Sequence, residues 1–142
     1  MLHLGSARLA AVWAALLLLA ASNRPHTGKA LARAIGCHGR YLEEDLRRLV
    51  DAGLLQSKRG KYGGYRLAVG PSRVRLVDVH DCLFAEEKSE AKGGLWGAAA
   101  AQLAEQEKAL RAQLAAFTLA DALDAARRAN VPLPEPVEDY CI

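Results

Sequence analysis

The segment 27–69 constrains the fold of this 142-residue chain more than any other part of the sequence. Within it, the segment 40–52 repeats apolar residues at intervals of four, three and one, which gives a helix one apolar face; they are Leu42, Leu46, Leu49 and Val50. Gly53 follows at the position where a left-handed residue ends a helix. Thr27 can cap a shorter helix that comes before it, and Gly36 and the turn 37–39 separate the two helices. The pattern predicts a helix-turn-helix.

A basic, glycine-rich turn follows the second of these helices. Short strands are expected at 54–58 and 65–69, and the turn between them reads Arg59-Gly60-Lys61-Tyr62-Gly63-Gly64. The glycine pair supplies the positive φ angles of a hairpin, with basic side chains at its tip. A helix-turn-helix followed by such a hairpin predicts a winged helix-turn-helix. In that fold the second helix enters the major groove of DNA, and the wing contacts the phosphate backbone or the minor groove.

The apolar run 9–21 admits two interpretations. It is too short to span a bilayer but long enough for the central part of a secretory signal, whose cleavage would remove about twenty residues. Alternatively, Ser6 caps a buried first helix that ends near residue 21. We favour the buried helix, because His3 and Arg8 make a weak charged region and because the next two helices need a packing partner.

The second half of the chain is also patterned for helices. Thr118 and Asp121 have the spacing of a capping box. The expected elements are a short helix at 77–85, a polar loop at 86–94, a long alanine-rich helix at 95–116 and a last helix from Thr118 to about 129. The predicted fold class is mainly α, with a two-stranded wing and a long C-terminal dimerisation helix. The expected organisation is a DNA-binding domain at 1–85, a linker at 86–94, dimerisation helices at 95–130 and a flexible tail at 131–142.

Charge is divided unevenly between the two halves. Residues 1–75 carry thirteen Lys or Arg against four Asp or Glu, whereas residues 76–142 carry six against twelve. A basic first half is typical of a surface that meets a polyanion. The sequence contains no G-x-S-x-G, no H-E-x-x-H and no phosphate-binding loop, so an enzyme is not expected.

Candidate DNA contacts lie on both helices of the motif, in the turn between them and at the wing tip. They are Lys29, His38, Arg40, Tyr41, Glu43, Glu44, Arg47, Arg59, Lys61 and Tyr62. An arginine can pair with guanine through two hydrogen bonds, and a glutamate can accept one from the cytosine amino group. The alternative is a set of ion pairs on a solvated helix face, in which Arg40 pairs with Glu43 or Glu44 and Glu43 pairs with Arg47. The turn before this helix and the wing after it favour DNA contact.

Several runs of the sequence resemble the IscR/NsrR-type family of bacterial winged helix-turn-helix transcriptional regulators. The runs are YLEEDLRRLVDAGLL (41–55), SKRGKYGGYRL (57–67), LVDV (76–79), LWG (95–97) and TLAD (118–121). The resemblance covers residues 6–125 and implies a cytoplasmic homodimeric transcription factor, usually a repressor, whose long helix forms the dimer interface. By position, Glu43 resembles the family's base-reading residue and Arg59 its wing arginine. The resemblance also supports a buried first helix.

The cysteines do not reproduce the cofactor site of that family. Many of its members hold an iron–sulfur cluster on three closely spaced cysteines, whereas the segment 83–95 contains none. Cys37, Cys82 and Cys141 are 45 and 59 residues apart, which matches no zinc or ferredoxin pattern. The cofactor is therefore undetermined. Cys82 can be a redox-sensing thiol, or one ligand of a metal or cluster site completed by His80, His3 or a second subunit. Alternatively, it can simply pack in the core.

Apolar residues along the long helix predict a homodimer. They are Leu95, Trp96, Leu103, Leu110 and Leu114, and the alanines between them allow close helix–helix approach. We therefore expect a cytoplasmic, dimeric, sequence-specific regulator with double-stranded DNA as its partner and no membrane association. It is expected to repress transcription in response to a redox, iron–sulfur or small-molecule signal. The alternatives are a metal or cluster sensor with non-standard ligands and a repressor with no bound cofactor.

Overall fold

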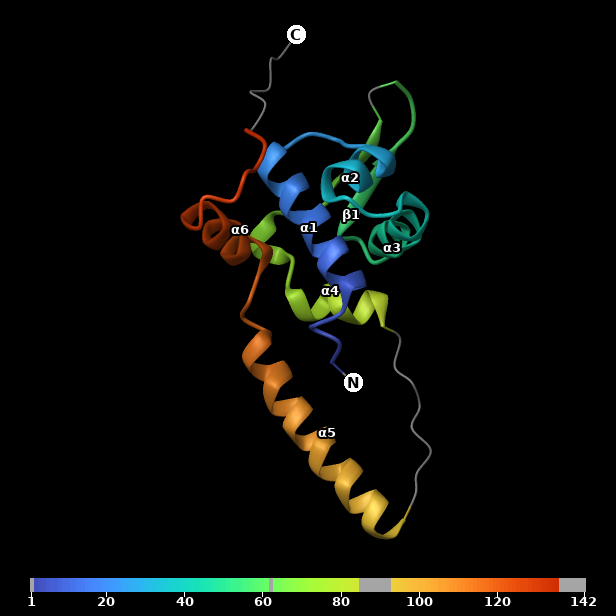
Figure 1. Ribbon diagram of the computed structural model, residues 1–142, viewed down its shortest axis with the longest axis vertical. Helices are drawn as coiled ribbons and strands as arrows, with labels where there is room; N and C mark the ends of the chain where they lie inside the picture. Colours follow the sequence, from blue (N-terminus) through green and yellow to red (C-terminus); the bar gives the residue numbers. More distant parts are fainter. Residues whose placement is uncertain (1, 62, 85–92, 136–142) are drawn as a thin grey trace.

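The computed structural model describes residues 2–61, 63–84 and 93–135. Within these ranges the chain forms six α-helices, one 3-10 turn and one antiparallel pair of strands (Figure 1). The elements are α1 (Ala7–Ser22), α2 (Gly28–Ile35), α3 (Gly39–Asp51), β1 (Leu55–Lys58), β2 (Gly64–Leu67), η1 (Pro71–Arg73), α4 (Leu76–Leu83), α5 (Gly94–Leu114) and α6 (Leu119–Arg128). This confirms the predicted fold class of a mainly helical chain with a two-stranded wing. Tyr62, Cys141, most of the predicted linker and the end of the predicted tail lie outside the described residues.

Helix α1 runs through the centre of the head, a name we use for all described elements except α5 (Figure 1). Val12, Ala15 and Leu16 of α1 are fully buried, and the helix contacts α2, α3, α4, α6 and β2. Full burial of a leucine or valine side chain contributes about 1.5–3 kcal/mol to folding stability. The side chains of α1 therefore form a major part of the core. The apolar run 9–21 thus forms the buried first helix that the sequence predicted. None of the described helices is both long enough and apolar enough to cross a bilayer.

Side-chain caps begin three of the helices where the sequence placed them. Ser6 accepts hydrogen bonds from the first turn of α1, and Thr27 accepts one from the first turn of α2. Thr118 and Asp121 form the expected capping box at the start of α6. Each such cap stabilises a helix by about 1 kcal/mol, which explains why these boundaries are readable from sequence.

The wing is tied to the segment before α2 as well as to itself. Strands β1 and β2 pair from Leu55 opposite Leu67 to Lys58 opposite Gly64. The backbone groups of Tyr65 and His26 exchange two hydrogen bonds of 3.0 and 2.7 Å. A β-carbon on Gly64 would collide with the His26 carbonyl, and its φ of +138° also requires glycine. The wing therefore lies at a fixed place beside the helix-turn-helix.

Helix α5 extends away from the head (Figure 1). No residue of α5 is buried. Its Arg111 donates hydrogen bonds of 2.9 and 3.1 Å to the Asp81 carboxylate of α4. Helix α6, which the sequence grouped with the long helix, returns to the head and buries Leu119 and Leu123 against α1 and η1. The backbone of Val74 accepts from the Leu119 N–H at 2.7 Å, and this contact fixes the return.

Candidate nucleic-acid interface

The turn between α2 and α3 is short and held by two hydrogen bonds. Gly36 ends α2 in the left-handed conformation, and the N–H groups of Gly36 and Cys37 both donate to the Ala32 carbonyl, at 2.8 and 3.0 Å. Leu42 and Leu46 face the core, so the opposite face of α3 is left in solvent. This arrangement leaves the exposed face of α3 accessible to a groove of DNA.

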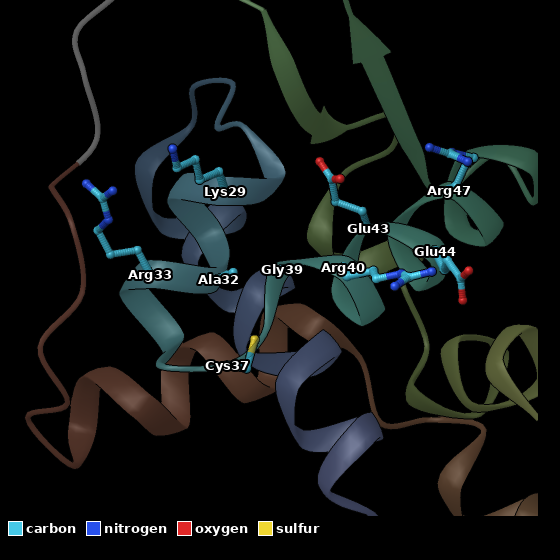
Figure 2. A pocket seen from close by; sticks show the side chains of 9 residues that line it. All are labelled: Lys29, Ala32, Arg33, Cys37, Gly39, Arg40, Glu43, Glu44 and Arg47. Carbon is cyan, nitrogen blue, oxygen red and sulfur yellow. The ribbon is translucent and has the colours of Figure 1, made fainter.

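An open groove of about 650 Å³ lies between α2 and α3 (Figure 2). Lys29 and Arg33 project from α2 on one side, and Arg40, Glu43, Glu44 and Arg47 project from α3 on the other (Figure 2). The groove is lined by four cationic side chains, Lys29, Arg33, Arg40 and Arg47, and two carboxylates, Glu43 and Glu44. The excess of positive charge suits a polyanion, and the carboxylates suit hydrogen-bond donors on base edges.

The described residues include all the predicted DNA contacts except Tyr62, and each of these side chains is exposed. The structure divides them among three places. The groove between α2 and α3 holds Lys29, Arg40, Glu43, Glu44 and Arg47, the groove between α1 and α3 holds His38 and Tyr41, and the loop after β1 holds Arg59 and Lys61. His38 stands at the start of α3 without making a side-chain cap.

The ion pairs considered as an alternative for α3 do not form. Within residues 2–61, 63–84 and 93–135, no salt bridge joins Arg40, Glu43 or Arg47 to another residue of the helix. Tyr65 of the wing lies close to two of them. Burial raises the pKa of the Tyr65 hydroxyl, and the charge of Glu43 raises it further while Arg47 lowers it. Glu43 and Arg47 of α3 therefore lie near Tyr65 of the wing.

One ionic contact that the sequence analysis missed fixes α3 to α1. The Asp45 carboxylate, 5% exposed, accepts hydrogen bonds of 2.9 and 2.6 Å from the Arg8 guanidinium. Arg48 lies 3.7 Å from the same carboxylate. The sequence did contain an indication of this contact. Asp45 lies on the same helical face as the buried Leu42 and Leu49, and a buried carboxylate requires a cationic partner.

The comparisons with known proteins agree with this geometry. The family of iron-dependent transcriptional regulators designated Rrf2 matches residues 6–125. The chain belongs to the Rrf2 family.

Solved structures of Rrf2 regulators resemble this Rrf2 protein over most of their length. IscR of T. potens has 27% sequence identity and a TM-score of 0.72, with 89% of this chain and 90% of that chain covered. CymR of B. subtilis, described as its global cysteine regulator, has 26% identity and a TM-score of 0.69, with 88% and 98% covered. No curated protein matches the sequence significantly. The Rrf2 protein is therefore a DNA-binding transcriptional regulator and not an enzyme, as predicted.

Of the two residues expected to bind a metal or respond to redox change, His80 makes hydrogen bonds within the fold, and Cys82 packs against the core. Nε2 of the buried His80 accepts a hydrogen bond of 2.9 Å from the His3 backbone, and its Nδ1 lies 3.0 Å from the Asp81 carboxylate. Burial raises the pKa of the Cys82 thiol, and the carboxylates of Asp78 and Asp81 raise it further. A protonated thiol is a weak nucleophile and a poor metal ligand.

The iron named in the family description has no fitting ligand set in the part of the chain that the structure describes. No group of three or more His, Cys, Asp or Glu residues that could hold a metal ion occurs there. Cys37 lies in the turn before α3, whereas Cys82 lies in α4. The segment 85–92 contains no cysteine either. These residues do not fit an iron–sulfur cluster held by three cysteines.

The Rrf2 protein presents most of its predicted dimer residues to solvent. Leu95 is 89% exposed and Leu103 is 69% exposed, although both are large apolar side chains. Trp96 and Leu110 of α5 are exposed as well, and Leu114 is half-buried near the end of the helix. A helix with this many exposed apolar residues has the composition of a protein interface.

Proposed function

We propose that this Rrf2 protein is a homodimeric repressor that binds operator DNA in the cytoplasm. In this proposal α3 of each subunit enters a major groove, and the wing contacts the neighbouring phosphates or the minor groove. Glu43, Arg40 and Arg47 contact bases, while Lys29, Arg59 and Lys61 contact phosphates. The open, positively charged groove between α2 and α3 is the observation that carries the DNA-binding part of the proposal.

Dimerisation through α5 rests on its exposed apolar face. Helix α5 has 21 residues and no buried side chain, and Leu103 and Leu110 lie seven residues apart on one face. Pairing of α5 with the same helix of a second chain would cover this face and place two heads side by side. Two α3 helices would then face the same side of DNA, about one helical turn apart.

We propose repression because of how such a dimer acts on DNA. Occupation of promoter DNA then excludes polymerase sterically. The signal would act where α4 meets α5, because Asp81 and Arg111 join the head to the dimer helix there. A change in this contact would alter the spacing of the two heads and hence the affinity for DNA.

Selection of bound sequences from a random or genomic DNA library tests the proposal. The wild-type protein should enrich one sequence with approximate twofold symmetry, and Glu43→Ala should lose the preference at one position in each half-site while nonspecific binding persists. Asp51→Ala is the matched control, because Asp51 is an exposed carboxylate at the far end of the same helix. Absence of any enriched sequence would refute sequence-specific binding, and an unchanged preference in Glu43→Ala would remove Glu43 from the base contacts.

A further inference from the structure

The side chain of Glu43 packs over a glycine of the neighbouring helix. Gly28 is the first residue of α2 and is buried, with Glu43 of α3 lying directly above it. A β-carbon built on Gly28 would stand 2.5 Å from Glu43 Oε1, 2.6 Å from Cγ and 2.9 Å from Cδ. These are the three nearest atoms to that position, and all belong to Glu43. The absence of a side chain at position 28 therefore creates the space that the Glu43 side chain occupies.

Within the described residues, no ionic partner holds Glu43 in place. Its carboxylate takes part in no salt bridge there, and the side chain as a whole is exposed. The charge of Glu43 also acts on the wing, because after burial it raises the pKa of the Tyr65 hydroxyl further. The Glu43 side chain thus packs closely over Gly28 and is not held by a salt bridge among the described residues.

We propose that Gly28 is a specificity-determining positioning residue, because it seats the side chain of Glu43 for base recognition. The inference rests on the proposed role of Glu43 in contacting a base. Nonbonded carbon atoms keep about 3.5–4.0 Å apart, so an alanine at position 28 displaces the Glu43 side chain by about 1 Å or more. A hydrogen bond to a base edge tolerates only about 2.7–3.2 Å between donor and acceptor, so this displacement breaks the contact.

The proposed substitution leaves the helix intact. Gly28 has no left-handed backbone angle, and no backbone atom is among the three nearest to the place that its β-carbon would take. Alanine is also a better helix former than glycine. Gly28→Ala should therefore fold with a melting temperature at least equal to that of the wild type. Its effect should be confined to base preference, because phosphate contacts supply most of the nonspecific affinity.

The test is DNA selection with wild type, Gly28→Ala, Glu43→Ala and the double variant, alongside Gly70→Ala. Gly70 lies before η1, outside the groove between α2 and α3, and its β-carbon would meet no atom within 4 Å. We expect Gly28→Ala to reduce discrimination at the base position that depends on Glu43 by about 5-fold or more, with nonspecific affinity unchanged. In the Glu43→Ala background the same substitution should have no further effect, and Gly70→Ala should keep the wild-type preference.

The outcomes separate this inference from the proposed function. A wild-type protein that selects no sequence refutes the proposed function and the inference with it. If the wild type selects a sequence but Gly28→Ala retains the full preference, only the inference fails. It also fails if Glu43→Ala leaves the preference unchanged, or if Gly28→Ala alters it equally with and without Glu43. Either result would mean that Gly28 does not act through that carboxylate.

Discussion

Removal of Arg8 should destabilise the head more than removal of Asp45, although the two residues share the same contact. Arg8→Ala leaves a carboxylate that is 5% exposed without the two hydrogen bonds it now accepts at 2.9 and 2.6 Å. Breaking a buried pair from one side costs about 3–5 kcal/mol. Arg8 is 38% exposed and Arg48 remains 3.7 Å from Asp45, so we expect about 2–3 kcal/mol here.

Asp45→Ala should lower the free energy of unfolding by less than Arg8→Ala does. In Asp45→Ala the Arg8 guanidinium can turn into solvent, because it lies at the edge of the head over the Phe84 ring, 5.2 Å from its centroid. We expect about 1–2 kcal/mol for that variant, and the double variant should cost less than the sum of the two by about 1–2 kcal/mol.

Urea unfolding followed by circular dichroism measures these differences. With a slope of about 1–3 kcal/mol per molar urea, Arg8→Ala should lower the midpoint by about 1–2 M. Arg33→Ala is a suitable control, since Arg33 is an exposed arginine of the same head. The argument would be refuted if the two single variants lost the same free energy of unfolding, or if their losses added up to that of the double variant. Either result would mean that the unpaired, buried Asp45 carboxylate is not the cause of the larger loss in Arg8→Ala.

Three further predictions concern DNA, assembly and pH. Arg59→Ala should weaken DNA binding and reduce the slope of log affinity against log salt concentration by about 1, as measured by fluorescence anisotropy. Gln56→Ala, on the same wing, should change neither the affinity nor the slope. An unchanged slope in Arg59→Ala would exclude a phosphate contact by Arg59. Leu103→Glu should shift sedimentation from dimer to monomer, because it places a charge on the exposed apolar face of α5; a persistent dimer would place the interface elsewhere. Burial, and then the charge of Arg24, lower the pKa of His26 in the folded protein. As the pH falls, the His26 imidazole is therefore protonated in the unfolded chain before it is protonated in the folded one. The free energy of unfolding should fall as the pH drops below about 6.5. His26→Gln should show a weaker fall in urea titrations between about pH 7.5 and 5.5, and an unaltered pH dependence would contradict this.

Local signals made much of the fold predictable. Ser6, Thr27 and Thr118 cap helices at the expected residues, because a cap depends on the chemistry of a few neighbouring positions. The position of α3 followed from its leucine spacing, and Gly53 adopts the expected positive φ beyond its end. Strand ends were less well predicted. The predicted strands were 54–58 and 65–69, whereas the paired strands are Leu55–Lys58 and Gly64–Leu67. The ends differ because strand register depends on the partner strand.

The candidate site was predicted in outline, but its tertiary contacts were not. Sequence spacing placed Glu43 on the exposed side of α3, yet it gave no indication that the side chain packs over Gly28 of another helix. It likewise showed an arginine at position 8 only as part of a charged N-terminal region, whereas the fold brings it to Asp45 across 37 residues. Such contacts depend on how helices pack, and periodicity within one helix carries no information about its neighbours.

Footprinting on the selected DNA tests the central claim that two α3 helices and two wings read one operator. Guanine-methylation interference reports major-groove contacts, and hydroxyl-radical cleavage reports protection of the backbone. The account predicts two patches of interference centred about 10 base pairs apart on one side of the duplex, with flanking backbone protection that is lost in Arg59→Ala. A single patch of interference, or flanking protection that persists without Arg59, would contradict it.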